Sequence, residues 1–239
     1  MIRVYKADIG CLLNGDLFDA SYKRMDPMRK SRIDSVKPEL NKRQILGAGI
    51  LLEYAFAECG KDYREASFAL GQYDKPYVQN MDVSFNISHS NDKVMCVFSP
   101  SLVDLGCDVE KDKKDGSKIA ERFFTEEEFL YLRTVEEEDE RKTLFTRLWT
   151  MKESFIKAVG EGLSLPLNDF SLIKDGKICE SISRDGKAFS FREYPAEGDY
   201  HFTLCYQEGA CGGMEDKENT VGDIEEIFLD KVLEKRVLL

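Results

Sequence analysis

The stretch RLWTMKESFIKAVGEGLSLPL, residues 147–167, decides the fold that we expect for this chain. Apolar residues recur at helical spacing through its first part and predict one apolar stripe: Leu144, Leu148, Met151, Phe155, Ala158 and Val159. The opposite face carries two residues that favour burial and two charged ones: Trp149, Ile156, Glu153 and Lys157. We therefore expect a helix that packs on one side and faces a cleft on the other. The alternative is a surface Glu–Lys pair at i,i+4, worth only about 0.2–0.5 kcal/mol.

Composition indicates a soluble globular protein, with 239 residues, 42% hydrophobic and 33% charged. That length allows one large domain or two modest ones. No run of about 18 apolar residues occurs, so we expect no membrane-spanning helix. The first residues are too short and too interrupted for a signal peptide. Seven cysteines without a CxxC pair indicate free thiols in a reducing cytoplasm.

The chain as a whole is acidic, but one segment of it is basic. A net charge of −11 disfavours nucleic acid as the main partner. Residues 23–43, here called the basic arm, nevertheless hold eight basic residues against three acidic ones: Lys23, Arg24, Arg29, Lys30, Arg32, Lys37, Lys42 and Arg43. The arm suggests a phosphate-bearing ligand or a small acidic partner protein. The alternative is a solvated helix face.

The order of predicted elements repeats once along the chain. A strand at 3–9 is followed by helices at 17–33 and 39–59, and then by strand-like runs at 66–70, 83–88 and 93–98. The second round has a strand at 102–110, helices at 117–123, 125–133 and 140–159, and strands at 169–174, 177–182, 187–193 and 200–206. Hairpin turns are expected at Asp175-Gly176 and Asp185-Gly186.

This order predicts an α+β fold with two similar subdomains, each with antiparallel strands packed on a long helix. We expect an N-terminal subdomain at 1–101, a C-terminal one at 102–207 and an extension at 208–239. Residues 224–239 of that extension fit either a helix or a strand with a helical end, and the sequence favours neither.

The strand at 102–110 offers a candidate metal site. Side chains two apart lie on one face of a strand, so Asp108 and Glu110 point the same way, and Gly106 leaves space beside them. Adjacent carboxylates repel, and a cation between them removes that cost. Oxygen ligands of this kind suit Mg²⁺. The alternative is a pair of solvated carboxylates at a strand end.

Two further positions are candidate phosphate contacts. His89 follows a strand and lies between Ser88 and Ser90, where hydroxyls and a ring nitrogen can hold a phosphate oxygen. A structural histidine is the alternative there, and His201, in an alternating strand, is expected to be structural. Lys75 precedes Pro76, which excludes helix at the lysine and stiffens the loop. For Lys75 the alternative is a solvated side chain.

Taken together and in this order, four segments resemble one family. They are FNISHS (85–90), GCDVE (106–110), RFFTEEE (122–128) and LWTMKESFIKAVGEGLSLPL (148–167). The chain resembles a 4′-phosphopantetheinyl transferase of the larger, surfactin-synthetase-activating type, which carries two subdomains on one chain. The likeness runs from about Pro27 to Phe170. It implies that the two subdomains are related by a pseudo-twofold axis.

The resemblance implies a reaction and a set of site residues. Such an enzyme transfers the 4′-phosphopantetheine arm of coenzyme A to a serine of an apo carrier protein, depends on Mg²⁺ and releases 3′,5′-ADP. Asp108, Glu110 and Glu153 match the family's magnesium ligands, and Lys157 matches the lysine that contacts the pyrophosphate. Asp108, Glu153 and Lys157 would be the catalytic residues. Glu153 would act as base, as metal ligand or as both.

The same resemblance implies contacts with coenzyme A. Ser88 and His89 match a phosphate-contacting pair, and Arg43 and Lys75 match cations near the 3′-phosphate and adenine. Arg29 and Arg32 stand where the family often has lysines that reach phosphate, and Lys30 is an alternative there. The implied enzyme is a cytoplasmic monomer with a carrier protein of fatty acid, peptide or polyketide synthesis as its partner, and has no nucleic acid or membrane partner. Two rival readings are a metal-dependent nuclease or other phosphotransferase, and a non-catalytic module that binds coenzyme A or a carrier protein.

Overall fold

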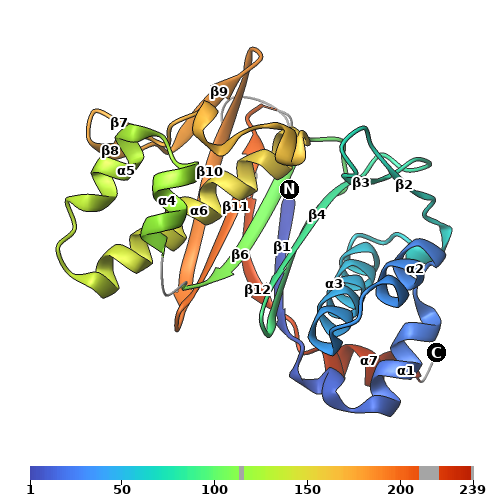
Figure 1. Cartoon of the computed structure of the whole chain (residues 1–239). Helices are drawn as coiled ribbons and strands as arrows, with labels where there is room; N and C mark the ends of the chain where they lie inside the picture. Colours follow the sequence, from blue (N-terminus) through green and yellow to red (C-terminus); the bar gives the residue numbers. More distant parts are fainter. Residues whose placement is uncertain (113–115, 210–220, 238–239) are drawn as a thin grey trace. The chain divides into compact units, whose positions relative to one another are not determined.

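The computed structural model describes residues 1–112, 116–209 and 221–237, which fall into two compact units (Figure 1). Unit 1 comprises Met1–Leu70, Pro76–Leu102 and Gly213–Leu239, and unit 2 comprises Gly71–Lys75 and Val103–Gly212. Both units contain helices and strands, so the predicted mixed α+β content is confirmed. Among the described residues, no helix combines the length and apolar character needed to cross a membrane.

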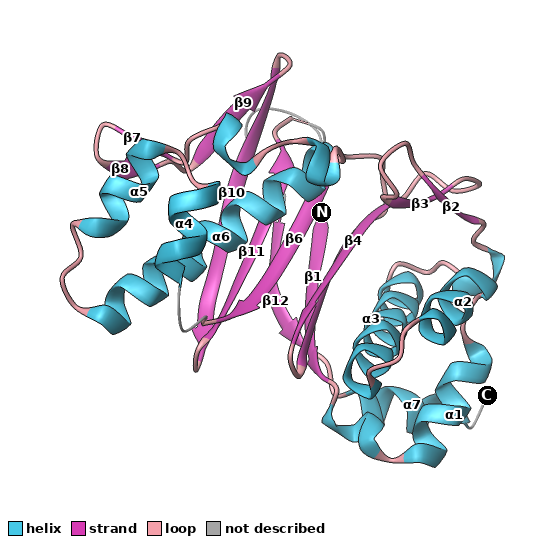
Figure 2. Cartoon of the chain, in the orientation of Figure 1, coloured by secondary structure: helices cyan, strands magenta, loops and turns pink. Residues whose placement is uncertain are grey.

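Unit 1 contains a four-stranded sheet with the order β12-β1-β5-β4 (Figure 2). Its strands are β1 (Ile2–Asp8), β4 (Ser84–Ser90), β5 (Lys93–Ser99) and β12 (Val221–Glu226). The pairs β1–β5 and β4–β5 are antiparallel, whereas β12 runs parallel to β1. A separate hairpin joins β2 (Phe68–Leu70) to β3 (Pro76–Val78), so the strand predicted at 66–70 is shorter than expected.

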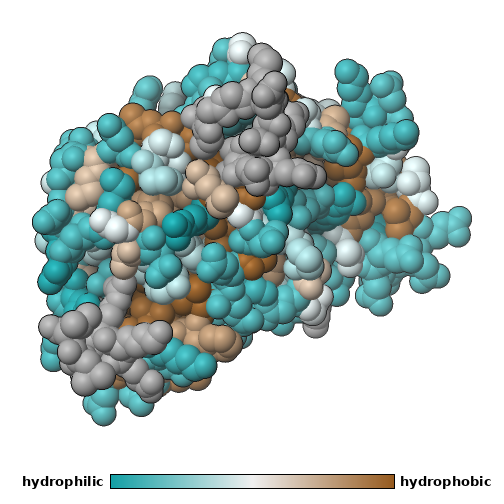
Figure 3. Space-filling model, turned by 180° about the vertical axis from the view of Figure 1, so that it is seen from behind, coloured by the Kyte–Doolittle hydropathy of each residue, from teal (hydrophilic) through white to brown (hydrophobic). Residues whose placement is uncertain are grey.

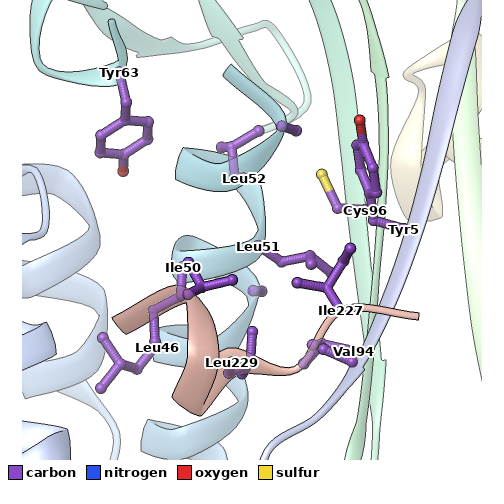
Figure 4. Close-up of a cluster of buried hydrophobic side chains, with 14 of the residues drawn as sticks. Tyr5, Leu46, Ile50, Leu51, Leu52, Tyr63, Val94, Cys96, Ile227 and Leu229 are labelled. Carbon is purple, nitrogen blue, oxygen red and sulfur yellow. The ribbon is translucent and has the colours of Figure 1, made fainter. Parts of the chain in front are cut away.

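Helices cover this sheet and complete the core of unit 1. They are η1 (Gly10–Leu13), α1 (Gly15–Arg24), α2 (Pro27–Ser35), α3 (Glu39–Glu58), η2 (Tyr63–Glu65) and α7 (Leu229–Val237). Leu51 of α3 lies beside Val94 of β5 and Ile227 in this core (Figure 4). The single helix predicted at 17–33 is wrong. The chain forms two helices because Asp26 accepts a hydrogen bond from the Arg29 amide and Pro27 occupies the first turn of the second helix.

Residues 227–233 contribute to the core of unit 1. Of the two alternatives left by the sequence, the structure has the strand followed by a helix, β12 and then α7. The Ile227 amide donates to the Lys6 carbonyl, which extends the pairing of β12 with β1. Leu229 and Val232 are buried in the same cluster as α3. Pairing with β1 and burial against α3 are tertiary contacts. Hydrophobic periodicity does not report such contacts, so the sequence alone left both alternatives open.

Unit 2 contains a second sheet with the order β6-β11-β10-β9 and only antiparallel pairs. Its strands are β6 (Leu105–Lys111), β9 (Ser181–Arg184), β10 (Lys187–Glu197) and β11 (Tyr200–Gln207), and a small hairpin joins β7 (Ile173–Lys174) to β8 (Lys177–Ile178). Both predicted Asp-Gly turns are confirmed. Asp175 and Gly176 have φ values of 53° and 69°, and Asp185 and Gly186 have 51° and 76°. The strand predicted at 169–174 is mostly replaced by a 3₁₀ turn and a loop.

The helical elements of unit 2 are α4 (Gly116–Phe123), α5 (Glu126–Arg133), α6 (Glu138–Val159), η3 (Gly162–Ser164) and η4 (Leu167–Asp169). The long helix α6 packs across β6 and β11. Gly106 permits this approach, because a Cβ atom there would lie 2.3 Å from the Ser154 carbonyl oxygen. The helix ends at Gly160, whose φ of 79° is left-handed. Leu148 and Phe155 of the predicted stripe are fully buried, and Ile156 from the other face is buried too.

Surface hydropathy agrees with the charged composition. The face shown in Figure 3 is largely hydrophilic, with hydrophobic residues in smaller separate areas. Several large apolar side chains of the described residues are exposed, among them Leu13, Leu102 and Leu130. They come from different elements, and scattered apolar residues of this kind are normal on a protein surface.

Candidate active site

The candidate metal ligands of β6 lie on the face of the sheet that α6 covers. In the register of β6 and β11, Asp108 lies opposite Thr203 and Glu110 lies opposite His201. Directly opposed residues share a face. On that face, the hydroxyl of Thr203 forms a buried hydrogen bond of 3.1 Å with the hydroxyl of Thr150 in α6. Asp108 is accordingly only 4% exposed, although a strand-end carboxylate would ordinarily be solvated.

Lys157 of α6 contacts Asp108 directly. Its Nζ atom lies 2.6 Å from Asp108 Oδ1 and also donates to the Cys107 carbonyl oxygen at 3.2 Å. Burial disfavours the charged ammonium, but the negative charge of Asp108, together with smaller effects that include Glu153, leaves the pKa of Lys157 raised. The lysine is therefore held in its cationic form beside the predicted metal ligands.

The three predicted carboxylates offer hard oxygen donors, the chemistry that Mg²⁺ prefers. Asp108 and Glu110 share one face of β6, and Glu153 lies one helical turn before Lys157 on α6. Within the part of the chain that the structure describes, no three His, Cys, Asp or Glu side chains are grouped closely enough to hold a metal ion. The donor types fit magnesium, and the assembly of Asp108, Glu110 and Glu153 around it stays a prediction.

Ser88 and His89 lie inside strand β4 of unit 1, which continues through Ser90. The sequence placed His89 after the end of the strand, and that placement is wrong. Successive side chains of a strand point to opposite faces. Ser88 is 6% exposed, whereas His89 is exposed and lies opposite Val94. The two side chains are therefore presented on different sides of β4, and their joint contact with one phosphate stays a prediction.

Arginines of the basic arm gather on α2 and α3. Arg29 is a buried residue that donates to the Ile45 carbonyl oxygen at 3.1 Å and lies 3.8 Å from an oxygen of Asp26. Desolvation, and then the positive charge of Arg29, lower the pKa of Arg32. The Nε atom of Arg43 is buried and meets no hydrogen-bond acceptor among the described residues. The buried Nε of Arg29 also lacks a hydrogen bond but lies beside Asp26, so Arg43 is the arginine whose Nε most favours an anion.

Lys75 is not the solvated lysine that a loop position suggests. Within unit 2 its Nζ atom donates to the Leu105 carbonyl oxygen at 3.0 Å and to the Ala158 carbonyl oxygen at 3.1 Å. Burial lowers its pKa to about 8. Two of its three N–H donors are thus committed to the start of β6 and the last turn of α6. A contact between the third N–H donor of Lys75 and coenzyme A stays a prediction.

Sequence reasoning missed a second lysine, Lys152. Its ammonium is fully buried and lies 2.8 Å from Oε1 of Glu128, which is fully buried as well. A signal was present, because Lys152 falls between Leu148 and Phe155 on the apolar stripe of α6. A charged residue on such a stripe must either leave the core or find a buried partner.

His201 was expected to be structural. Its Nε2 atom lies 3.0 Å from Oδ1 of Asp112.

A cavity in unit 1 is an alternative place for a ligand. It has a volume of about 760 Å³ and is lined by Arg24, Glu53, Lys61, Asp62 and Arg64, among others. Its charged residues largely neutralise one another, since Arg24 lies 3.2 Å from Glu53 and Arg64 lies 2.7 Å from Asp62. None of the site residues expected from the sequence lines it. The carboxylates of unit 2 therefore remain the stronger candidate site.

Comparison with known proteins identifies the family of this chain. The family described as the 4′-phosphopantetheinyl transferase superfamily matches residues 104–205. A 4′-phosphopantetheinyl transferase of Bacillus subtilis is 35% identical over 179 residues, which are 73% of this chain and 79% of the relative. The 4′-phosphopantetheinyl transferase Sfp of Bacillus subtilis strain 168 is 34% identical over 166 residues, or 68% of this chain and 73% of Sfp.

A third relative extends the comparison to another genus. The 4′-phosphopantetheinyl transferase gsp of Aneurinibacillus migulanus is 36% identical over 133 residues, 56% of this chain and 54% of the relative. The matched region of the family includes β6 and α6, the two elements joined by the contact between Asp108 and Lys157. The chain belongs to the 4′-phosphopantetheinyl transferase superfamily.

Proposed function

We propose that this chain transfers the 4′-phosphopantetheine arm of coenzyme A to a serine hydroxyl of an apo carrier protein and releases 3′,5′-ADP. Family membership supports the reaction class. The single observation that carries the site is the 2.6 Å contact between Lys157 of α6 and Asp108 of β6, since it joins the two sequence motifs in one place. We expect the enzyme to act as a monomer in the cytoplasm.

The proposed metal is Mg²⁺, with Asp108, Glu110 and Glu153 as its protein ligands. When bound, magnesium would supply positive charge to the pyrophosphate oxygens of coenzyme A. The oxygen donors present on β6 and α6 favour this ion over softer metals. Lys157 and the metal would both draw on the carboxylate of Asp108, so metal loading is expected to change the contact that Lys157 makes.

Protein groups would perform the remaining chemistry. Lys157, kept cationic by Asp108, would stabilise negative charge on the departing phosphate or protonate it. Glu153 would accept the proton of the attacking serine hydroxyl, directly or through water. Because phosphoryl attack needs charge neutralisation and in-line positioning more than covalent help, no protein nucleophile is required.

Coenzyme A contacts are proposed at Arg43, Lys75, Ser88 and His89. The buried Nε of Arg43, which meets no acceptor among the described residues, favours an anion near α3. We also propose that the units are similar subdomains related by a pseudo-twofold axis. Each pairs a mainly antiparallel sheet with one long helix, α3 in unit 1 and α6 in unit 2.

The proposed protein partner is an acidic carrier protein that contacts the basic arm. Part of the arm is already engaged: Arg29 is buried, Arg24 lies beside Glu53, and Lys42 lies 2.7 Å from Glu39. Lys23 and Lys37 are exposed and offer positive charge to a partner. Because the chain as a whole carries −11, recognition would depend on this local charge and on apolar contact rather than on long-range attraction.

The experiment that tests this function is intact-mass analysis of the carrier. The protein would be mixed with coenzyme A, Mg²⁺ and apo carrier proteins of the acyl, peptidyl and polyketide types. A mass increase of one phosphopantetheine that EDTA abolishes would support the transfer reaction. No increase with any carrier, while coenzyme A still binds, would favour a non-catalytic binding module. Phosphodiester cleavage without coenzyme A would favour the nuclease.

A further inference from the structure

Lys152 and Glu128 form a buried ion pair in which every donor of the ammonium is used. Besides the 2.8 Å contact with Glu128, Nζ of Lys152 donates to the carbonyl oxygens of Leu167 and Phe170, both at 2.7 Å. The ring of Phe170 lies 4.2 Å from the ammonium, within the range of a cation–π contact. Both charged side chains have no exposed surface.

Glu128 is as fully bonded as its partner. Its Oε1 accepts a hydrogen bond from the Leu172 amide at 2.8 Å, and its Oε2 accepts from the amide and hydroxyl of Thr125 at 2.9 and 3.1 Å. The pair therefore connects α6, the first turn of α5 and the segment 167–172 within unit 2 (Figure 1). These parts are distant in sequence and are joined here by directional bonds.

We propose that Lys152 and Glu128 are positioning residues for the transfer reaction, because their ion pair fixes the rotation of α6 and thereby the direction of Glu153. The inference rests on the proposed function. Lys152 and Glu153 are adjacent, so their side chains leave the helix about 100° apart. Three directional bonds at Lys152 leave α6 little freedom to rotate, and Glu153 is fixed with it.

Stability alone does not account for such a pair. A buried ion pair is often no more stabilising than well-packed apolar residues of the same volume, whereas its geometry is more specific. Contacts on the other side of α6 also restrict the rotation of the helix. Thr150 bonds to Thr203, and Lys157 bonds to Asp108, both on the face of the sheet that carries the proposed metal ligands. The helix is thus held on both sides of Glu153.

The test replaces both charges at once. The variant Lys152→Met with Glu128→Gln nearly keeps the side-chain volumes and leaves no buried unpaired charge. The carbonyl oxygens of Leu167 and Phe170 lose their donor, so we expect a lower melting temperature and assay the variant below it. We expect kcat to fall about tenfold to a hundredfold, because a displacement near 1 Å at a reacting group costs that much. The KM for the carrier should stay within about twofold. Mg²⁺ titrated calorimetrically in the presence of coenzyme A should bind more weakly, a readout that does not depend on turnover.

A second ion pair on α6 supplies the matched control. Arg147 and Glu193 form a bidentate pair at 2.5 and 2.7 Å but are 42% and 32% exposed, and neither contacts the site. Arg147→Gln with Glu193→Gln should leave kcat and magnesium binding within about twofold of the wild type. A folded Lys152/Glu128 variant with the same small changes would overturn the positioning role, since a purely structural pair would lower only the melting temperature.

The wild-type enzyme assayed in parallel separates the two proposals. If the wild type modifies the carrier and the folded variant does so equally well, only the positioning role fails. If the wild type transfers nothing to any carrier, the proposed function fails and the positioning role with it. Should the double variant not fold, Glu128→Gln alone, which keeps the hydrogen-bonding oxygen, would be measured below its melting temperature against the same criteria.

Discussion

The ammonium of Lys157 lies 2.6 Å from Oδ1 of Asp108, and this contact joins the helix and the strand that carry the proposed chemistry. The lysine stays cationic because the carboxylate offsets the cost of burial. The carboxylate in turn is almost fully withdrawn from water. A magnesium ion at Asp108 would therefore replace or share a contact that the protein already makes.

Replacing Glu153 by glutamine should keep the fold and remove most of the turnover. The side chain is partly exposed, so the loss of charge should not unfold α6. If Glu153 is base or metal ligand, kcat should fall by about 10²-fold or more. Carrier modification measured by intact mass, with the melting temperature as a check on folding, gives the answer. Near-normal turnover would remove Glu153 from the site.

Replacing Asp108 by alanine should abolish magnesium-dependent activity and also destabilise unit 2. Lys157 would lose the carboxylate that offsets its burial, so the free energy of unfolding should fall by about 1–3 kcal/mol. Asp104→Asn is the matched control, because Asp104 lies just before the same strand and pairs with Lys187 at the surface. An unchanged magnesium titration in the Asp108 variant would exclude it as a ligand.

Lys75→Ala discriminates between two roles of that lysine. If the side chain contacts the 3′-phosphate, binding of coenzyme A should weaken more than binding of dephospho-coenzyme A. If it serves only the carbonyl oxygens of Leu105 and Ala158, both ligands should lose affinity equally. Calorimetric titration of the two ligands measures the difference. Equal losses would reject the contact with the 3′-phosphate.

The lowered pKa of Lys75 predicts a pH dependence of stability. Its pKa is about 8 in the folded chain and 10.5 for an unperturbed lysine. Between these values the unfolded state binds more protons, so the contribution of Lys75 to the free energy of unfolding should rise with pH. Below pH 8 both states are protonated, and this contribution should be constant.

Lys75→Met isolates that effect, because the titration of other groups is common to both proteins. Urea unfolding at several pH values between 7 and 10.5 would give the stability of the variant and the wild type. The difference between them should change in favour of the wild type as pH rises above about 8. A difference that is independent of pH would show that the lysine has an ordinary pKa.

Local sequence signals predicted many of the elements and the family. The spacing of Leu148, Met151 and Phe155 predicted the buried stripe of α6, and each Asp-Gly pair predicted its turn. Such features depend on neighbouring residues only, through helical periodicity and backbone preference. The motif order identified the 4′-phosphopantetheinyl transferase superfamily, and the comparisons confirm it. The boundary at Asp26-Pro27 was also a local signal, and our single helix at 17–33 ignored it.

Other features were decided only by tertiary structure. The sequence by itself determined that α6 carries a lysine on its apolar stripe, but not that Glu128 and two carbonyl oxygens would surround it. It presented Arg29 and Lys75 as available cations, and folding committed both to backbone carbonyl oxygens. The physical reason is common to all three. A buried charge must be bonded to groups that lie far away in sequence, and only the packing of elements brings those groups together.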